Sequence, residues 1–198
     1  GWDATDTVRS NTSGKRPPGS DHKTYMILKE AIRERIGAQD IRQICALCSG
    51  EANNRIKAEL FSLINSPDDR TGYNALWTFT HFAPADIAWL QQKRDKLIDL
   101  VLTVEHEGKR RLLLTLLDQL TDDKKGFRGD YLDFCLSRIN STEPCSIRTL
   151  CLKQAFAQCR FYPELIAEFK NEIELMEYGE LTPGLRAAIK NIRKKIGS

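Results

Sequence analysis

The chain has 198 residues, of which 41% are hydrophobic and 29% are charged. That is enough apolar material for one domain with a buried core, and too much for a disordered chain. The 30 basic and 27 acidic residues give a net charge of +3, which by itself predicts neither a nucleic-acid nor a membrane partner. No apolar stretch has the length needed to cross a bilayer, so we expect a soluble protein with no membrane contact.

The N-terminal segment differs from the rest of the chain. Residues 1–20 are polar and lack any hydrophobic period, which predicts an N-terminal arm. From residue 21 onward, apolar residues recur at steps of three and four. Leu28 and Ile32 share one face in this way, and Gly37 supplies a helix stop. We therefore predict one helical domain over residues 21–198.

The same spacing continues to the end of the chain and predicts further helices. Short polar connections separate them, and no segment alternates apolar and polar residues over the length of a strand. Helices joined by short connections form antiparallel hairpins, so the expected fold class is all-α. The predicted helices cover residues 39–48, 52–66, 71–82, 84–101, 109–120, 131–139, 147–159, 163–176 and 182–196.

An internal repeat is visible in the second helix of each predicted hairpin. Arginines stand near its start at separations of 40, 38 and 38 residues, at Arg70, Arg110, Arg148 and Arg186. A period near 40 residues with two helices per unit is the length of HEAT and armadillo repeats. Stacked hairpins bury the apolar face that one hairpin cannot cover, which produces an α-α superhelix or solenoid. Regular repeats are expected over about 53–196, with a core that includes Trp77, Leu113, Leu117 and Cys151.

A family resemblance rests on three segments: Asp69–Trp77, the long predicted helix after Pro84, and Lys109–Leu113. Residues 53–196 resemble HEAT/armadillo-like helical repeat proteins, and in particular small bacterial HEAT-like proteins of unassigned activity. Some proteins of this fold are DNA alkylation-repair glycosylases. The resemblance therefore implies a helical repeat fold and leaves a nucleic-acid-binding protein of that type as an alternative function.

Catalytic and metal-binding motifs are not found in the sequence. Cys45 and Cys48 form a Cys-x-x-Cys pair, but a zinc site needs a second pair at similar spacing, and none follows. The three histidines have no metal-ligand spacing, and no nucleophile elbow or phosphate loop occurs. The prediction is no catalytic residue, no metal and no cofactor. We interpret the cysteines as small buried hydrophobes in a reducing, cytoplasmic compartment.

The candidate binding residues lie on the polar side of the predicted second helices. Positions one, five and eight after each repeat arginine point away from the apolar face, toward the concave surface where solenoids bind ligands. An ordinary solvated helix face would show the same pattern. The mixed charge of these positions favours a protein or peptide partner over DNA, which needs a continuous basic groove. The predicted function is a non-catalytic binding scaffold that uses Thr78, Arg111, Thr115, Asp118, Lys153 and Lys194.

Overall fold

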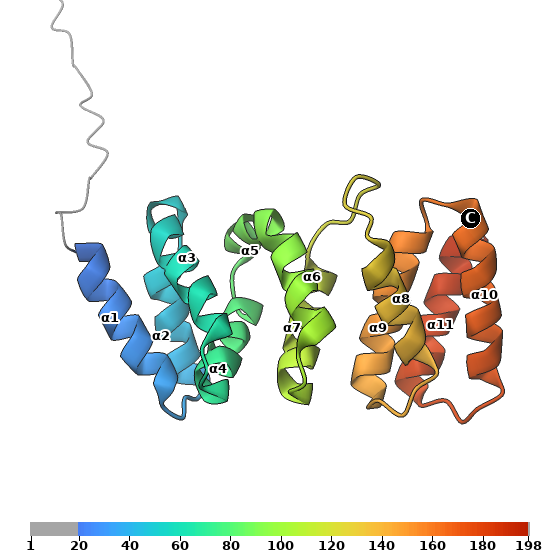
Figure 1. Ribbon diagram of the computed structural model, residues 1–198, viewed down its shortest axis with the longest axis horizontal. Helices are drawn as coiled ribbons and strands as arrows, with labels where there is room; N and C mark the ends of the chain where they lie inside the picture. The colour runs from blue at the N-terminus through green and yellow to red at the C-terminus, as the bar shows by residue number, and fades with distance from the viewer. Residues whose placement is uncertain (1–19, 198) are drawn as a thin grey trace, which may run out of the picture.

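The computed structural model describes residues 20–197 and consists of helices over that range, without a strand (Figure 1). The predicted arm lies outside the described residues, apart from Ser20, which begins the first helix. Eleven α-helices and three short 3-10 turns follow one another in the described part. The α-helices are α1 (Ser20–Arg33), α2 (Ala38–Cys48), α3 (Asn54–Ser62), α4 (Asp69–Thr80), α5 (Pro84–Leu90), α6 (Arg94–Thr103), α7 (Glu107–Gln119), α8 (Gly129–Ile139), α9 (Cys145–Cys159), α10 (Pro163–Glu177) and α11 (Pro183–Ile196).

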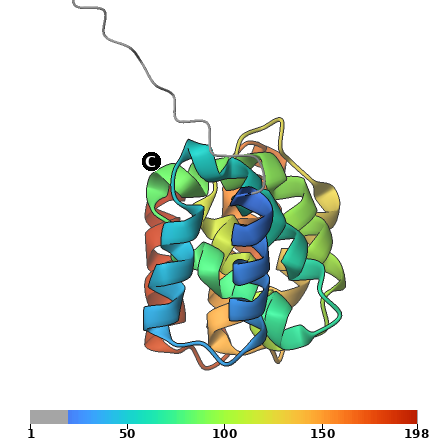
Figure 2. The same cartoon turned by 90° about the vertical axis from the view of Figure 1, so that its left-hand side faces the viewer.

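The helices form two layers of antiparallel hairpins. The second helices α2, α4, α7, α9 and α11 each pack on the next in an unbroken series. The first helices α1, α3, α6, α8 and α10 form the other layer, in which α1 packs on α3, α8 packs on α10, and α6 touches α8 over a smaller area. Figure 2 looks along the stack from the α1 end and shows α2 and the red C-terminal α11 on the same side. This is the architecture of a solenoid, as predicted.

The predicted single helix over 84–101 is wrong, because the chain bends there. It forms α5, a 3-10 turn over Gln91–Lys93, and then α6. Gln91 binds the backbone of Thr121 with both atoms of its amide, at 2.9 Å each. Arg94 reaches the same loop through Asp122 and the carbonyl oxygen of Gly126. These contacts join the bend to a loop about 30 residues further along the chain. The residues near the bend therefore do not reveal it in the sequence.

The core is one cluster of contacting buried side chains that runs from Leu28 to Ile192. Leu113, Leu117 and Cys151 are buried in it, as predicted. Trp77 is not, since it packs against the cluster with part of its surface exposed.

The register of the repeat follows from the residues that cap the second helices. Asp68, His106 and Thr182 each accept a hydrogen bond from the backbone N–H three residues later. Pro144 occupies the same place before α9, and the four capping residues are spaced by 38 residues each time. The period is therefore constant when it is counted from the caps.

Counting from the caps corrects the predicted equivalence of the four arginines. Arg110, Arg148 and Arg186 are the fourth residues after their caps. Gly72 takes that place in α4, so Arg70 stands two residues too early. The two-residue error also explains why Trp77 was assigned to the core, because Phe79 lies at the position equivalent to Leu117.

A buried ion pair fixes the joint between the first two hairpins. Gly50 has a φ of 84°, a left-handed conformation that favours glycine. Its N–H donates to Asp86 Oδ1 at 2.9 Å, and its carbonyl oxygen accepts from Lys57 Nζ at 2.6 Å. Lys57 Nζ also lies 3.1 Å from Asp86 Oδ1. One buried lysine thus ties the turn after α2 to α3 and α5.

Candidate functional site: the exposed face of the second helices

Five of the six predicted site residues lie on the side of the second helices that faces away from the core. This second-helix face carries Arg111, Thr115 and Asp118 on α7, Lys153 on α9 and Lys194 on α11. Thr78 is the exception. It is fully buried, and its hydroxyl donates to the carbonyl oxygen of Asn74 at 2.8 Å. Thr78 is therefore a structural residue of α4, and its assignment to the binding face is wrong.

The polar residues of this face interact across neighbouring repeats. Asp118 lies 3.9 Å from Lys153 Nζ and accepts a hydrogen bond from Gln154 Nε2 at 3.4 Å. Both partners belong to α9, so the contact bridges α7 and α9. The Thr115 hydroxyl donates to the carbonyl oxygen of Arg111 at 2.8 Å within α7. The face thus combines acidic, basic and hydroxyl groups within two adjacent helices.

An aromatic ladder on α4 was missed from the sequence. Tyr73 and Trp77 occupy the fifth and ninth places after their cap, where α7 carries Arg111 and Thr115. The ring centroids of Tyr73 and Trp77 are 6.5 Å apart, and His81 lies 6.0 Å from Trp77. The spacing of the capping residues, instead of that of the arginines, would have placed these rings on the second-helix face.

Contacts from α7 hold the ladder in place. His106, the cap of α7, has its ring 6.2 Å from that of Tyr73. Gly108 lies so close that a Cβ atom there would be 3.0 Å from Tyr73 Cε2. Arg111 Nη2 donates to the Tyr73 hydroxyl at 3.4 Å. Tyr73 and Trp77 remain partly exposed, so the face presents preordered aromatic surface beside a guanidinium. Trp, Tyr and Arg are the residue types that contribute most to protein interfaces.

The Cys45–Cys48 pair is a structural feature of α2. Burial, together with the charge of Asp86, raises the pKa of Cys45 to about 11. Burial first and Cys45 second raise the pKa of Cys48 to about 12. Both thiols are protonated at neutral pH, whereas metal binding and disulfide exchange require the thiolate. Cys145 departs from the predicted burial of the cysteines, because it is exposed at the start of α9.

Comparison with known proteins identifies the family. A model of the HEAT repeat domain matches residues 28–196. The chain belongs to the HEAT-repeat family. No curated protein and no solved structure matches it. The matched range begins in α1, so it covers the α1–α2 hairpin as well as residues 53–196, over which the regular repeats were expected. Over the described residues, no helix is long and apolar enough to cross a membrane, and no group of three or more acidic, histidine or cysteine side chains could hold a metal.

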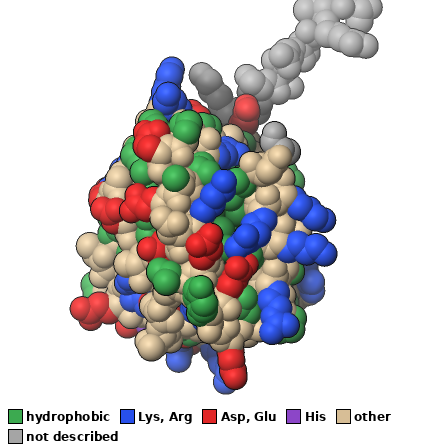
Figure 3. Space-filling model, turned by 90° about the vertical axis from the view of Figure 1, so that its right-hand side faces the viewer, with side chains coloured by type: hydrophobic (Ala, Val, Ile, Leu, Met, Phe, Trp, Pro, Cys, Tyr) green, Lys and Arg blue, Asp and Glu red, His purple; other side chains and the backbone are tan. Residues whose placement is uncertain are grey.

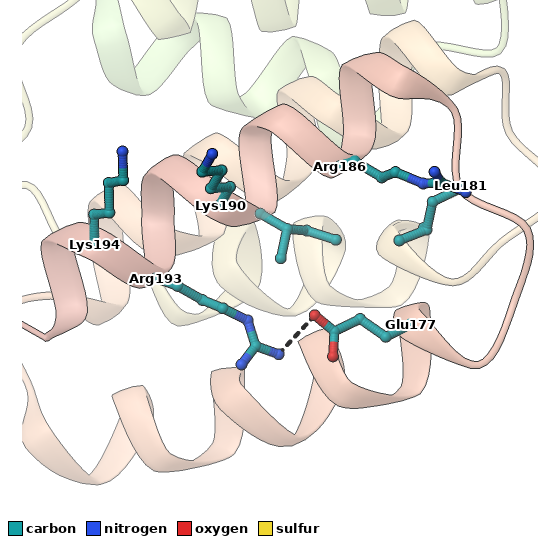
Figure 4. A pocket seen from close by; sticks show the side chains of 7 residues that line it. Glu177, Leu181, Arg186, Lys190, Arg193 and Lys194 are labelled. Atoms are coloured by element: carbon teal, nitrogen blue, oxygen red, sulfur yellow. Dashed lines mark ion pairs between the residues drawn. The ribbon is translucent and has the colours of Figure 1, made fainter.

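The last HEAT hairpin carries a second surface feature. A hollow of about 550 Å³ opens between α10 and α11 (Figure 4). Across this hollow, Arg193 Nη2 and Glu177 Oε1 form an ion pair at 2.8 Å. Figure 3 views this end of the solenoid and shows basic side chains gathered toward one side of it. The remaining lining residues are Leu181, Arg186, Ile189, Lys190 and Lys194.

Proposed function

We propose that this protein is a non-catalytic HEAT-repeat scaffold that binds a protein or peptide segment across its second-helix face. The aromatic ladder carries the proposal, because Tyr73 and Trp77 are partly exposed and held in place beside Arg111. Thr115, Asp118 and Lys153 supply polar contacts on the neighbouring helices. Rigid aromatic side chains bury a large area at a small entropic cost, which makes them effective anchors.

The charges of the face support a peptide ligand. Asp118 shares α7 with the basic residue Arg111, and it lies 3.9 Å from Lys153 Nζ on α9. Such a face offers both donors and acceptors to a peptide backbone and its side chains. A cytoplasmic location belongs to the same proposal. It is supported by four buried free thiols, which suit a reducing compartment.

Nucleic acid is the second candidate, and one observation favours it. Tyr73 and Trp77 lie side by side next to Arg111, and bases stack on such aromatic rings in single-strand binding sites. Asp118 opposes this function, because it places a carboxylate on the path that a phosphate backbone would follow across α7 and α9.

The test is a peptide selection followed by measured affinities. A displayed random-peptide library is selected on the wild-type protein alone, so that peptides bound at any surface are recovered. Recovered peptides are then titrated by calorimetry. Arg111→Glu is expected to weaken them about tenfold or more, as for a central interface residue. Lys96→Glu, the same charge change on exposed α6 of the other layer, should have no effect.

Two results would reject the proposal. Peptides that bind Trp77→Ala and Arg111→Glu as tightly as the wild type would place the ligand elsewhere. Binding of single-stranded or duplex DNA would support the second candidate if it weakened steeply between about 50 and about 200 mM salt and required Arg111. Thermal denaturation of each variant shows that its fold is intact.

A further inference from the structure

The α10–α11 hairpin differs from the three repeats before it in the residues of its second helix that would face a following hairpin. The eighth residue after the cap is a fully buried leucine in α4, α7 and α9, at Leu76, Leu114 and Leu152. In α11 this place belongs to Lys190, which is exposed. The eleventh place changes in the same way, from buried Phe79, Leu117 and Ala155 to the half-exposed Arg193.

Three cations form a basic stripe along α11, defined here as Arg186, Lys190 and Lys194. They recur every fourth residue and line one side of the hollow. Among the described residues, none of their side chains has an ion-pair or hydrogen-bond partner, whereas Arg193 is paired with Glu177. Figure 4 shows Lys190 and Lys194 projecting from α11 on the side away from Glu177.

A polar outer face keeps an uncovered repeat in solution, but solubility does not require charges of one sign. Unpaired charges of one sign at four-residue spacing repel one another on a helix. The basic stripe therefore carries more positive charge than a solvated end requires. Its charge would be balanced by a ligand that brings carboxylates at a matching spacing.

The hollow beside the stripe adds an apolar contact. Leu181 and Ile189 line it between α10 and α11, and its volume of about 550 Å³ admits large side chains. A ligand that fits this end must therefore combine negative charge with an apolar side chain. That combination is typical of one face of an amphipathic helix.

We propose that the α10–α11 end of the solenoid binds an acidic amphipathic helix of a partner protein. With a rise of about 1.5 Å per residue, the cations of the stripe are about 6 Å apart along α11. Glutamates at four-residue spacing on a partner helix have the same separation and face the stripe one to one. The partner helix packs on α11 as α11 packs on α9, and it places an apolar side chain in the hollow.

The charges around the stripe favour this ligand over nucleic acid. Duplex DNA carries a charge about every 1.7 Å of its axis, so its binding surfaces are broad and basic. Here Glu177 on α10 lines the same hollow as the stripe, and Glu174 lines a neighbouring pocket with Arg193. A narrow basic stripe beside an apolar hollow, with an acidic residue on the other side of that hollow, matches a helix better than a duplex.

The test uses a labelled synthetic helical peptide of about 18 residues, with glutamates at every fourth position and leucines on the adjacent stripe. A control peptide carries glutamine in place of glutamate. Fluorescence anisotropy should show that the glutamate peptide binds about tenfold more tightly than the control and loses affinity with salt. The double variant Arg186→Glu/Lys190→Glu, which spares the second-helix face, should weaken binding about tenfold or more. Lys96→Glu, the same charge change at an exposed residue of α6 in the other layer, should leave it unchanged.

Several outcomes would overturn the proposal. The first is that the glutamate and glutamine peptides bind the protein equally tightly. The same conclusion follows if the glutamate peptide binds the wild type and the double variant equally tightly while thermal denaturation shows that both are folded. The second is tighter, competing binding of duplex DNA. The third is that the wild type forms a dimer in sedimentation equilibrium and the double variant is a monomer. That result would show that the α10–α11 end binds a second copy of the chain. Arg111→Glu should not affect the probe, so failure here is distinguishable from failure of the second-helix face.

Discussion

Helices α7 and α11 occupy the same place in their repeats but have opposite chemistry on one face. Leu114 and Leu117 of α7 are fully buried, and the equivalent residues of α11 are Lys190 and Arg193. The residues seven places after the cap, Leu113 and Ile189, are buried in both helices because both pack on a preceding helix. The difference shows that this face of a second helix belongs to the core only where another hairpin packs against it.

The largest expected effect tests this comparison in the core. Leu117→Ala removes a fully buried side chain and should lower the free energy of unfolding by about 2–5 kcal/mol. Arg193→Ala changes the equivalent residue of α11, whose side chain is 48% exposed, and should cost less than about 0.5 kcal/mol. Urea denaturation measures both. Equal costs would show that the two faces do not differ as described.

A second contrast concerns the fourth residue after the cap. Arg110 donates to Glu143 Oε1 at 2.9 Å and to the carbonyl oxygen of Val104 at 3.0 Å, whereas the side chain of Arg186 has no such partner among the described residues. Arg110→Ala should therefore cost about 1.5–3 kcal/mol, the range for hydrogen bonds to charged groups. Arg186→Ala should be nearly neutral in the same assay. A similar loss for both would mean that the arginines stabilise the fold through packing alone.

The same place in α4 belongs to Gly72, where close packing replaces the arginine. A Cβ atom there would lie 2.8 Å from the carbonyl oxygen of Ile64, which is backbone and cannot move freely. Gly72→Ala should destabilise the protein by about 1–3 kcal/mol. The control is Gly184→Ala in α11, where nothing lies within 4 Å, and a gain of about 0.4–1 kcal/mol is expected. A neutral Gly72→Ala would contradict the close approach of α4 and the turn before it.

The fold was predictable from the sequence because solenoid repeats repeat their apolar spacing. The hairpins contributed buried residues at the expected steps, apart from α4 with its partly exposed Trp77, and the HEAT-repeat match confirms the family. The break between α5 and α6 was not predictable. It depends on Gln91 binding Thr121 and Arg94 binding Asp122, which are contacts between hairpins.

The candidate site was predictable only in the repeats whose arginine is the fourth residue after the cap. Arg110 and Arg148 stand at equivalent positions, so Arg111 and Lys153 were assigned correctly to the second-helix face. In α4 the arginine used to align the repeats, Arg70, stands two residues before the equivalent position. Tyr73 and Trp77 were therefore not recognised as residues of the second-helix face. The position that recurs with a constant period is the capping residue before each second helix. The four capping residues have the same place in the backbone but different side chains. A 38-residue period of Asp, His, Pro and Thr is therefore not visible by residue identity.

The smallest expected effect compares an ion pair between inner repeats with the pair at the end. Asp69 on α4 lies 2.6 Å from Lys109 Nζ on α7. The hydrogen bond and charge of Lys109 hold the pKa of Asp69 below its ordinary value of 3.8. A carboxyl with a depressed pKa in the folded state stabilises the fold above the unfolded pKa, and this contribution disappears as pH falls through the folded value. Asp69→Asn should therefore lower the thermal midpoint slightly near neutral pH, and the difference should shrink as the pH falls below 3.8 toward the depressed pKa of the folded state.

Glu177→Gln at the end is the matched change, because it removes the carboxylate that contacts Arg193. Both partners of that pair are nearly half exposed, at 44% and 48%, so its interaction is screened by solvent and salt. Its effect on the midpoint should be smaller than that of Asp69→Asn at low salt. Thermal denaturation from about pH 7 to about pH 3 at two salt concentrations separates the two variants. A pH-independent loss for Asp69→Asn would show that Asp69 acts as a helix-start residue of α4, and not through its charge on Lys109.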